Sequence, residues 1–167
     1  MYSTGVCPYC QRAEMLLKQL GRQFGGAGSW KAGLEVERRF LIDSMKVDST
    51  QFALRDGSGL SSSNLVSPKA FATLLTWMRA HPRFESFAAG LPQSGQRGSL
   101  KSRFVGTPLE GKVRAKTGSI SRVNTLAGYI ELPGRTLTFA IEANNHTLGS
   151  RVMIPQIDSL VVQMGKK

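Results

Sequence analysis

The stretch KVRAKTGSISRVNTLAGYIELPGRTLTFAIEAN, residues 112–144, contains three runs of the composition typical of β-strands. The runs are residues 113–116, 125–132 and 136–143. Pro133-Gly134, between the last two, is a common turn pair. Because strands that follow one another closely in sequence usually pair, we expect a three-stranded antiparallel meander.

Helical patterns lie on both sides of this sheet. Apolar residues recur at helical spacing in four segments. They are residues 9–20, the segment after Ser29, the segment that starts at Pro68, and residues 151–164. We expect Gly21 to cap the C-terminus of the first helix and Ser29 to cap the N-terminus of the second. The fold class is therefore expected to be α+β, with helices followed by a small antiparallel sheet and a C-terminal helix.

The length and composition indicate one packed domain. The chain has 167 residues, 41% of them apolar, and a formal net charge of +11 from 22 basic and 11 acidic residues. No run reaches the roughly 18 apolar residues of a membrane span. No signal-peptide pattern follows Met1, so we expect the chain as written to lie in the cytoplasm, with no membrane span.

Metal and cofactor chemistry find no support in the sequence. Cys7 and Cys10 are the only cysteines, too few for a disulfide scaffold or a Cys-only zinc site. Neither His81 nor His146 has a second ligand type at a recognisable spacing. We therefore expect no metal and no cofactor.

Much of the positive charge is concentrated in the second half of the chain. Seven basic residues share a stretch with a single acid, Glu110. They are Arg97, Lys101, Arg103, Lys112, Arg114, Lys116 and Arg122. Such a surface attracts nucleic acid, anionic lipid or a carboxylate-bearing substrate alike. Because the sequence lacks zinc-finger spacing and aromatic-rich recognition strands, we do not expect nucleic acid as the partner.

The motif Lys116-Thr117-Gly118-Ser119 ends the first predicted strand. A Lys-Thr-Gly strand lines the active site of serine acyl-transfer enzymes that handle penicillin. A strand edge offers backbone groups to an extended peptide, glycine permits close approach, and hydroxyls with an ammonium bind a carboxylate. The tripeptide alone also fits a lysine at a strand end before an ordinary turn.

Two further segments accompany the motif in a fixed order. DGSGLSxxN spans residues 56–64 and LPxSGxxGSL spans 91–100, both ahead of residues 112–129. Together they closely resemble, over about residues 13–164, the C-terminal part of the class C penicillin-binding D-alanyl-D-alanine carboxypeptidases. The resemblance implies part of a penicillin-binding transpeptidase-like fold. It also implies a serine-type carboxypeptidase/endopeptidase of the periplasm or cell envelope, with a peptidoglycan stem peptide or a β-lactam as its ligand.

The resemblance also implies roles for the motif. Lys116 would polarise the catalytic cleft, and Thr117 and Ser119 would contact the substrate carboxylate. Gly118 would complete the substrate-binding strand, and the Ser119 amide would be one donor of the oxyanion hole.

Two other catalytic elements of the family do not match. No serine in the chain has a lysine three residues later, so the Ser-x-x-Lys nucleophile and base are missing. Alignment on Ala13 to Leu17 places Pro8 and Cys10 where the family has Ser-x-Asn. Ser62-x-Asn64 fits that pattern but lies inside the glycine-rich segment, and we interpret it as coincidence. We expect the chain to be inactive alone and to need a further N-terminal part.

The N-terminus has a resemblance of its own. Gly5-Val6-Cys7-Pro8-Tyr9-Cys10 before a helix is similar to the start of a glutaredoxin, in which the helix lowers the thiol pKa. We therefore expect a glutaredoxin-like head over residues 1–12 and a carboxypeptidase part over 13–167. The alternatives are a thiol-disulfide oxidoreductase that uses Cys7 and Cys10, and a non-catalytic basic module that binds peptidoglycan or another polyanion.

Overall fold

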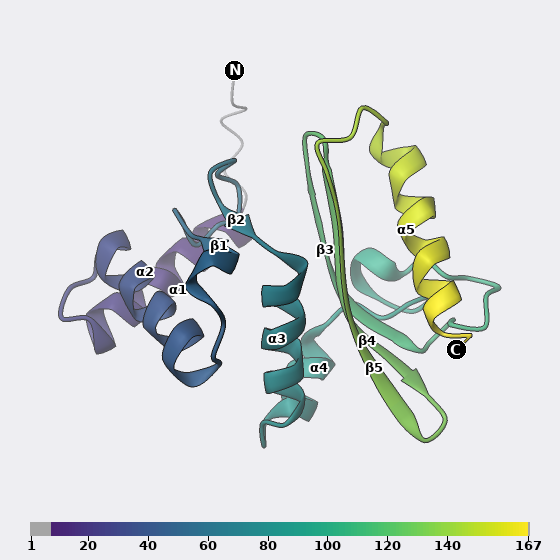
Figure 1. Ribbon diagram of the computed structural model, residues 1–167, viewed down its shortest axis with the longest axis horizontal. Helices are drawn as coiled ribbons and strands as arrows, with labels where there is room; N and C mark the ends of the chain where they lie inside the picture. Colours follow the sequence, from purple (N-terminus) through teal and green to yellow (C-terminus); the bar gives the residue numbers. More distant parts are fainter. Residues whose placement is uncertain (1–7, 167) are drawn as a thin grey trace. The chain divides into compact units, whose positions relative to one another are not determined.

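The computed structural model describes residues 8–166 (Figure 1). Length and composition indicated one packed domain, whereas the contacts divide the chain into two compact units, Met1–Ala70 and Phe71–Lys167. None of the described helices combines the length and apolar character needed to cross a bilayer.

The first unit consists mainly of two helices joined by a glycine-rich loop. Helix α1 spans Pro8–Phe24 and α2 spans Trp30–Arg39, followed by a π-helical turn, Phe40–Ser44. Ser29 caps α2 as expected, since its side chain accepts a hydrogen bond from the Ala32 amide. After the 3₁₀ turn Ser49–Gln51, the two-residue strands β1 (Phe52–Ala53) and β2 (Leu65–Val66) pair antiparallel.

Gly21 is not the C-terminal cap that the sequence indicated. Helix α1 continues through it to Phe24, and Gly21 is buried where α1 approaches α2. A Cβ at Gly21 would lie 2.6 Å from the Gly33 amide nitrogen, and one at Gly33 would lie 2.2 Å from the Leu17 carbonyl oxygen. The two glycines therefore allow the two helix backbones to approach closely. Helix termination and close approach both favour glycine, and the local sequence does not distinguish them.

Gly33→Ala is expected to destabilise the first unit. The added methyl group would overlap the Leu17 backbone, so the helices must separate, at a cost of about 1–3 kcal/mol in the free energy of unfolding. Denaturant unfolding measures this change. Gly28→Ala is the matched control, because the nearest atom to its Cβ is 3.8 Å away. Equal stability of the two variants would contradict this account of the packing.

The second unit contains the predicted sheet. Helices α3 (Pro68–Arg79) and α4 (Phe84–Gly90) and the 3₁₀ turn η3 (Gly98–Leu100) precede it. The strands are β3 (Val113–Ile120), β4 (Val123–Leu132) and β5 (Arg135–Asn144), and α5 (Ser150–Met164) follows them. The strands pair antiparallel in the order β3-β4-β5. The expected meander, the C-terminal helix and the α+β class are confirmed.

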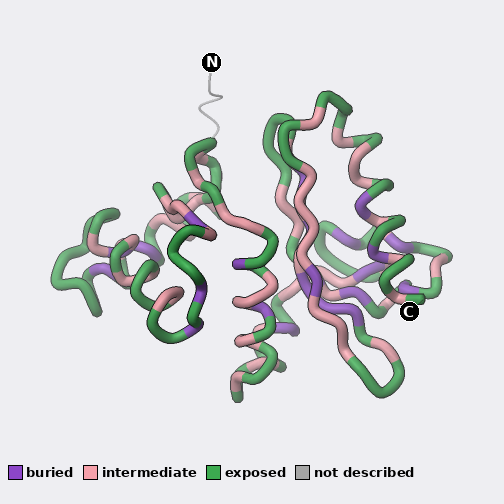
Figure 2. Tube along the Cα trace, in the orientation of Figure 1, coloured by how far each residue is buried: buried purple, intermediate pink, exposed green. Residues whose placement is uncertain are grey.

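The two faces of the sheet are covered by different helices (Figure 1). On one face, apolar side chains of the sheet form the main core with α5 and the loop that precedes β3. Buried positions, purple in Figure 2, occur in all of these segments. This core contains Leu100, Phe104, Leu109, Val113, Ala115, Leu126, Ile130, Phe139, Ile157 and Val161. On the other face, the Tyr129 hydroxyl donates to the Leu75 carbonyl of α3 at 2.8 Å, and the Phe84 ring of α4 packs edge-on against Tyr129.

Candidate functional site

Alternate residues of β3 direct their backbone groups to opposite sides of the strand. On the inner side, the Glu131 amide donates to the Lys112 carbonyl at 2.8 Å. On the outer side, the Ser94 amide donates to the Val113 carbonyl at 2.9 Å and the Ala115 amide donates to the Pro92 carbonyl at 3.0 Å. In an antiparallel ladder both backbone groups of a residue point the same way. Thr117 and Ser119 therefore direct their amides and carbonyls to the outer edge.

This outer edge is paired over only part of its length. Residues 92–94 cover it as far as Ala115, and β3 is an edge strand of its sheet within the described chain. Lys116 and Ser119 are exposed, Thr117 and Gly118 are half-buried, and the Lys116 ammonium donates to the Thr117 carbonyl at 2.6 Å. The Lys-Thr-Gly-Ser motif thus lies on an edge that can pair with an extended peptide.

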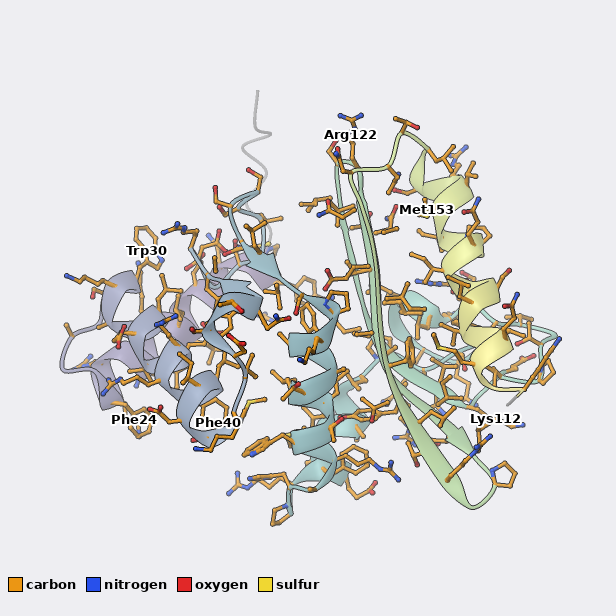
Figure 3. The ribbon with its side chains drawn as sticks, in the orientation of Figure 1. Phe24, Trp30, Phe40, Lys112, Arg122 and Met153 are labelled. Atoms are coloured by element: carbon orange, nitrogen blue, oxygen red, sulfur yellow. The ribbon has the colours of Figure 1, made fainter. Side chains whose placement is uncertain are left out.

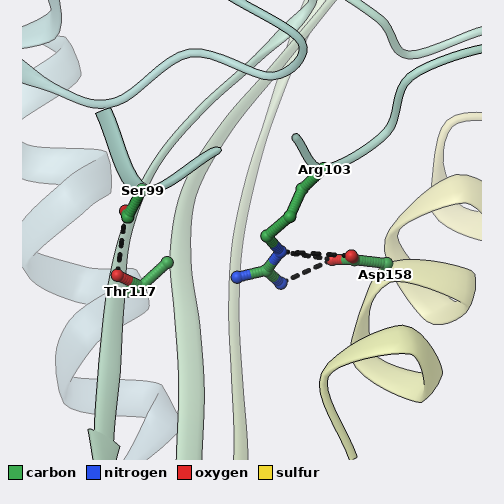
Figure 4. Close-up of polar contacts among 4 residues, drawn as sticks. All are labelled: Ser99, Arg103, Thr117 and Asp158. Atoms are coloured by element: carbon green, nitrogen blue, oxygen red, sulfur yellow. Dashed lines mark hydrogen bonds and ion pairs between the residues drawn. The ribbon is translucent and has the colours of Figure 1, made fainter. Parts of the chain in front are cut away.

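The two hydroxyl groups of the motif have partners that the sequence did not single out. The Thr117 hydroxyl donates to the Ser99 hydroxyl oxygen at 2.9 Å (Figure 4), and the Asn124 amide donates to the Ser119 hydroxyl oxygen at 2.9 Å. Ser99 belongs to the LPxSGxxGSL segment, so this segment and the motif meet at one place. Asn124 is the residue of β4 that lies directly opposite Ser119. The strand register alone could have indicated this pair.

Gly118 has a packing role on the inner side of the strand. A Cβ at Gly118 would lie 2.4 Å from the Thr125 hydroxyl oxygen on β4. Because Gly118 is an even-numbered position, its backbone groups face β4 and not the outer edge. Gly118 therefore leaves room for the Thr125 side chain of β4, while Thr117 and Ser119 form the outer edge.

The loop that carries Ser99 is fixed at two points. The Ser94 hydroxyl is fully buried, donates to the Leu109 carbonyl at 2.7 Å and accepts from the Val113 amide at 3.0 Å. Arg103 forms a two-pronged ion pair with Asp158 of α5, with Nε 3.1 Å from both carboxylate oxygens (Figure 4). These contacts hold the 94–103 segment between β3 and α5.

Asp158→Ala is expected to lower the free energy of unfolding by about 2 kcal/mol, since it removes the hydrogen-bonded partner of a largely buried guanidinium. Thermal unfolding measures this change. Glu35→Ala is the control, because Glu35 pairs with Arg39 at 3.8 Å in solvent and should contribute at most about 0.5 kcal/mol. The packing role of Arg103 would be refuted if the two variants lost the same stability.

The basic cluster is partly neutralised. Arg103 pairs with Asp158, and Arg114 lies 2.9 Å from a Glu131 carboxylate oxygen. In residues 8–166, no group of three His, Cys, Asp or Glu side chains could hold a metal ion. The exposed ammonium of Lys116 remains beside the unpaired edge, where it favours an anionic ligand.

Ser62-x-Asn64 belongs to the turn formed by residues 55–64. The Asn64 side chain accepts from the Arg55 amide at 2.7 Å and donates to the Asp56 carboxylate at 3.0 Å. Burial alone would raise the pKa of Asp56, but hydrogen bonds from Asn64, Gly59, Ser58 and Ser61 lower it. These contacts occupy Asn64 within the turn, which favours the interpretation of the pattern as coincidence.

The thiol pair is described only in part. Helix α1 begins at Pro8 and includes Cys10, and Cys7 lies outside the described residues. The helix runs on without a break past residue 12, the predicted end of the glutaredoxin-like head. The head and its redox role stay predictions.

Comparison with solved structures identifies the fold. The chain is similar in structure to penicillin binding protein 4 (dacB) from Haemophilus influenzae, solved in complex with a β-lactam. The TM-score is 0.82 at 26% sequence identity, over 93% of this chain and 38% of that protein. The fold is therefore that of a penicillin-binding protein.

Sequence comparison defines the family. The chain belongs to the D-Ala-D-Ala carboxypeptidase 3 (S13) family, whose model matches residues 10–164. It is 40% identical over 140 residues to the D-alanyl-D-alanine carboxypeptidase of Actinomadura sp. (strain R39), covering 81% of this chain and 26% of that protein. It is 32% identical over 167 residues to penicillin-sensitive carboxypeptidase A of Dictyostelium discoideum, covering 92% of this chain and 31% of that protein. The family resemblance is confirmed, and the chain spans about a quarter to a third of these two relatives.

Proposed function

We propose that this chain supplies the substrate-binding edge of a serine-type D-Ala-D-Ala carboxypeptidase/endopeptidase. Its ligand is a peptidoglycan stem peptide, or a β-lactam that mimics one, and its place of action is the cell envelope, where peptidoglycan lies. The observation that carries this proposal is the unpaired outer edge of β3, at which Thr117 and Ser119 present backbone groups beside the Lys116 ammonium.

Each group of the motif has a distinct task in this proposal. The Thr117 backbone pairs with the peptide as an added strand, and the Ser119 amide donates to the carbonyl oxygen as negative charge develops on it. The Thr117 and Ser119 hydroxyls and the Lys116 ammonium bind the terminal carboxylate. Lys116 must then share or release its bond to the Thr117 carbonyl, and the Thr117 hydroxyl must turn its hydrogen from Ser99 to the carboxylate.

The covalent step needs a serine oxygen that attacks the peptide carbonyl and releases the terminal D-alanine, after which water hydrolyses the ester. The 167 residues contain no Ser-x-x-Lys to perform it. The chain therefore binds and orients the peptide, and its acyl transfer depends on a nucleophile from outside these residues.

Peptide binding tests this assignment. Titration with a peptide ending in D-Ala-D-Ala should shift the amide NMR signals of residues 116–120, and a C-terminally amidated peptide should not do so. Thr117→Val and Ser119→Ala should each weaken binding about tenfold, the value of one hydrogen bond to a charged group. Thr138→Val, on the far edge strand β5, is the matched control. Shifts elsewhere, or equal binding of the amidated peptide, would refute the proposal.

A further inference from the structure

Ser119 is connected by hydrogen bonds to a histidine. Asn124, only 1% exposed, donates from Nδ2 to the Ser119 hydroxyl oxygen, and its Oδ1 lies 3.0 Å from Nε2 of His146. The other ring nitrogen of His146, Nδ1, lies 2.7 Å from the Leu148 carbonyl oxygen. The chain of contacts runs from the edge strand β3, through β4, to the turn between β5 and α5.

The Leu148 carbonyl determines where the His146 ring carries its first proton. A carbonyl oxygen only accepts, so Nδ1 must be protonated whenever this contact is made. In the neutral ring Nε2 then carries a lone pair, which would face the lone pairs of Asn124 Oδ1. The contacts in the structure are therefore satisfied by the doubly protonated ring, whose Nε2 donates to Asn124.

The neutral ring requires the opposite amide orientation. Asn124 must rotate its carboxamide so that the NH₂ group donates to Nε2 of His146 and Oδ1 faces Ser119. The Ser119 hydroxyl then donates its hydrogen to Asn124 and presents only lone pairs to the substrate edge. With the charged ring, Ser119 accepts from Asn124 and its hydrogen is available to a carboxylate.

We propose that Asn124 and His146 are positioning residues that set the direction of the Ser119 hydroxyl, so that protonation of His146 favours binding of the terminal carboxylate. This inference rests on the proposed function, because it assigns the carboxylate to Ser119. Because histidine is the side chain that ordinarily gains or loses a proton between about pH 5 and 8, measurements at the two ends of that range test the proposal. By linkage, carboxylate binding must in turn favour the protonated ring.

The two ring nitrogens of His146 contact Leu148 and Asn124, and the charged residues of the flanking elements are Arg122, Arg151 and Glu142. Arg122 lies at the tip of the β3–β4 hairpin (Figure 3), and its backbone carbonyl accepts a hydrogen bond from the His146 backbone amide at 3.3 Å. Arg151 lies in the first turn of α5. Glu142 of β5 is opposite Thr125 and so lies on the other face of the sheet from Asn124. Burial raises the pKa of Glu142.

Nitrogen NMR of the histidine rings tests the first step. Neutral His146 should carry its proton on Nδ1. The chain's other histidine is an internal contrast: the Arg83 amide donates to Nδ1 of His81 at 3.1 Å, so neutral His81 should carry its proton on Nε2. The Asn124 NH₂ signals should change together with protonation of His146. The proposal would be overturned if neutral His146 carried its proton on Nε2, or if the Asn124 NH₂ signals did not change when His146 is protonated.

Peptide titration at two pH values tests the second step. The D-Ala-D-Ala peptide should bind about 3- to 10-fold more weakly at about pH 8 than at about pH 5.5, the value of one hydrogen bond. His146→Gln should abolish this difference, and His81→Gln should leave it unchanged. At pH 7, added peptide should increase the protonated fraction of His146. Binding with the same pH dependence in His146→Gln would overturn the proposal.

The two steps separate this inference from the function on which it rests. If no peptide binds at either pH, the proposed substrate edge is wrong, and the assignment of the carboxylate to Ser119 is wrong with it. If the peptide binds at residues 116–120 with no dependence on His146, the substrate edge stands and the positioning role is refuted.

Discussion

Incubation of the 167-residue chain with a β-lactam is expected to leave its intact mass unchanged. A β-lactam acylates this class of enzyme through a serine oxygen that a neighbouring base activates, and no Ser-x-x-Lys occurs in these residues. Groups of this kind act as a unit, so substrate-binding residues without the nucleophile retain almost none of the acyl transfer. Intact-mass spectrometry distinguishes no adduct from a stoichiometric one.

The penicillin binding protein 4 of Haemophilus influenzae, which has been solved in complex with a β-lactam, is the positive control. Adducts on Cys7 or Cys10 are excluded by peptide mapping. A stoichiometric adduct on any serine would contradict the prediction and identify a nucleophile with a different base. Ser58 and Ser61 would be the first to examine, since both lie in the glycine-rich segment 56–64.

The sheet could be predicted from the sequence in type and order, and its strand ends could not. The first strand was expected over residues 113–116, and β3 continues to Ile120. Gly118 weakens a strand interior, although Thr117 before it favours one, so the local sequence does not predict that the strand continues. The pairing of residues 117–119 with Asn124, Thr125 and Leu126 holds them in the sheet. Tertiary contacts here outweigh local preference.

Features that depend on contacts distant in sequence were the ones missed. Arg103 and Asp158 are 55 residues apart, so nothing local distinguishes them from other charged residues. Gly21 could end a helix or allow two helices to approach closely, and only the position of Gly33 decides between these two roles. In both cases the residue type was visible and its partner was not.

The candidate site shows the same division. The Lys-Thr-Gly-Ser motif indicated which residues form it, because the chemistry of carboxylate binding restricts the residue types. Ser99, Asn124 and His146 were not assigned roles, since nothing in their local sequence shows which groups their side chains contact. The register of β3 with β4 brings Asn124 to the motif, and the turn Gly98–Leu100 brings Ser99 to Thr117.

Gly128→Ala is expected to lower the free energy of unfolding by about 3 kcal/mol or more. Gly128 is buried in the central strand β4 opposite Ala115. A Cβ there would lie 2.1 Å from the Arg114 carbonyl oxygen and 2.6 Å from the Ala115 Cα. Both are backbone atoms, so no side-chain rotation relieves the overlap and β3 must move away from β4. Denaturant unfolding gives the size of the loss.

Gly90→Ala is the matched control for this variant, because no atom lies within 4 Å of a Cβ at the end of α4. Its stability should stay within about 0.5 kcal/mol of the original chain. Since β3 carries the proposed substrate edge, any folded Gly128→Ala protein should also show displaced amide signals over residues 116–120 and weaker peptide binding. A Gly128→Ala protein as stable as Gly90→Ala would show that β3 is not held by this close approach. Strand register alone would then have to account for the position of Thr117 and Ser119.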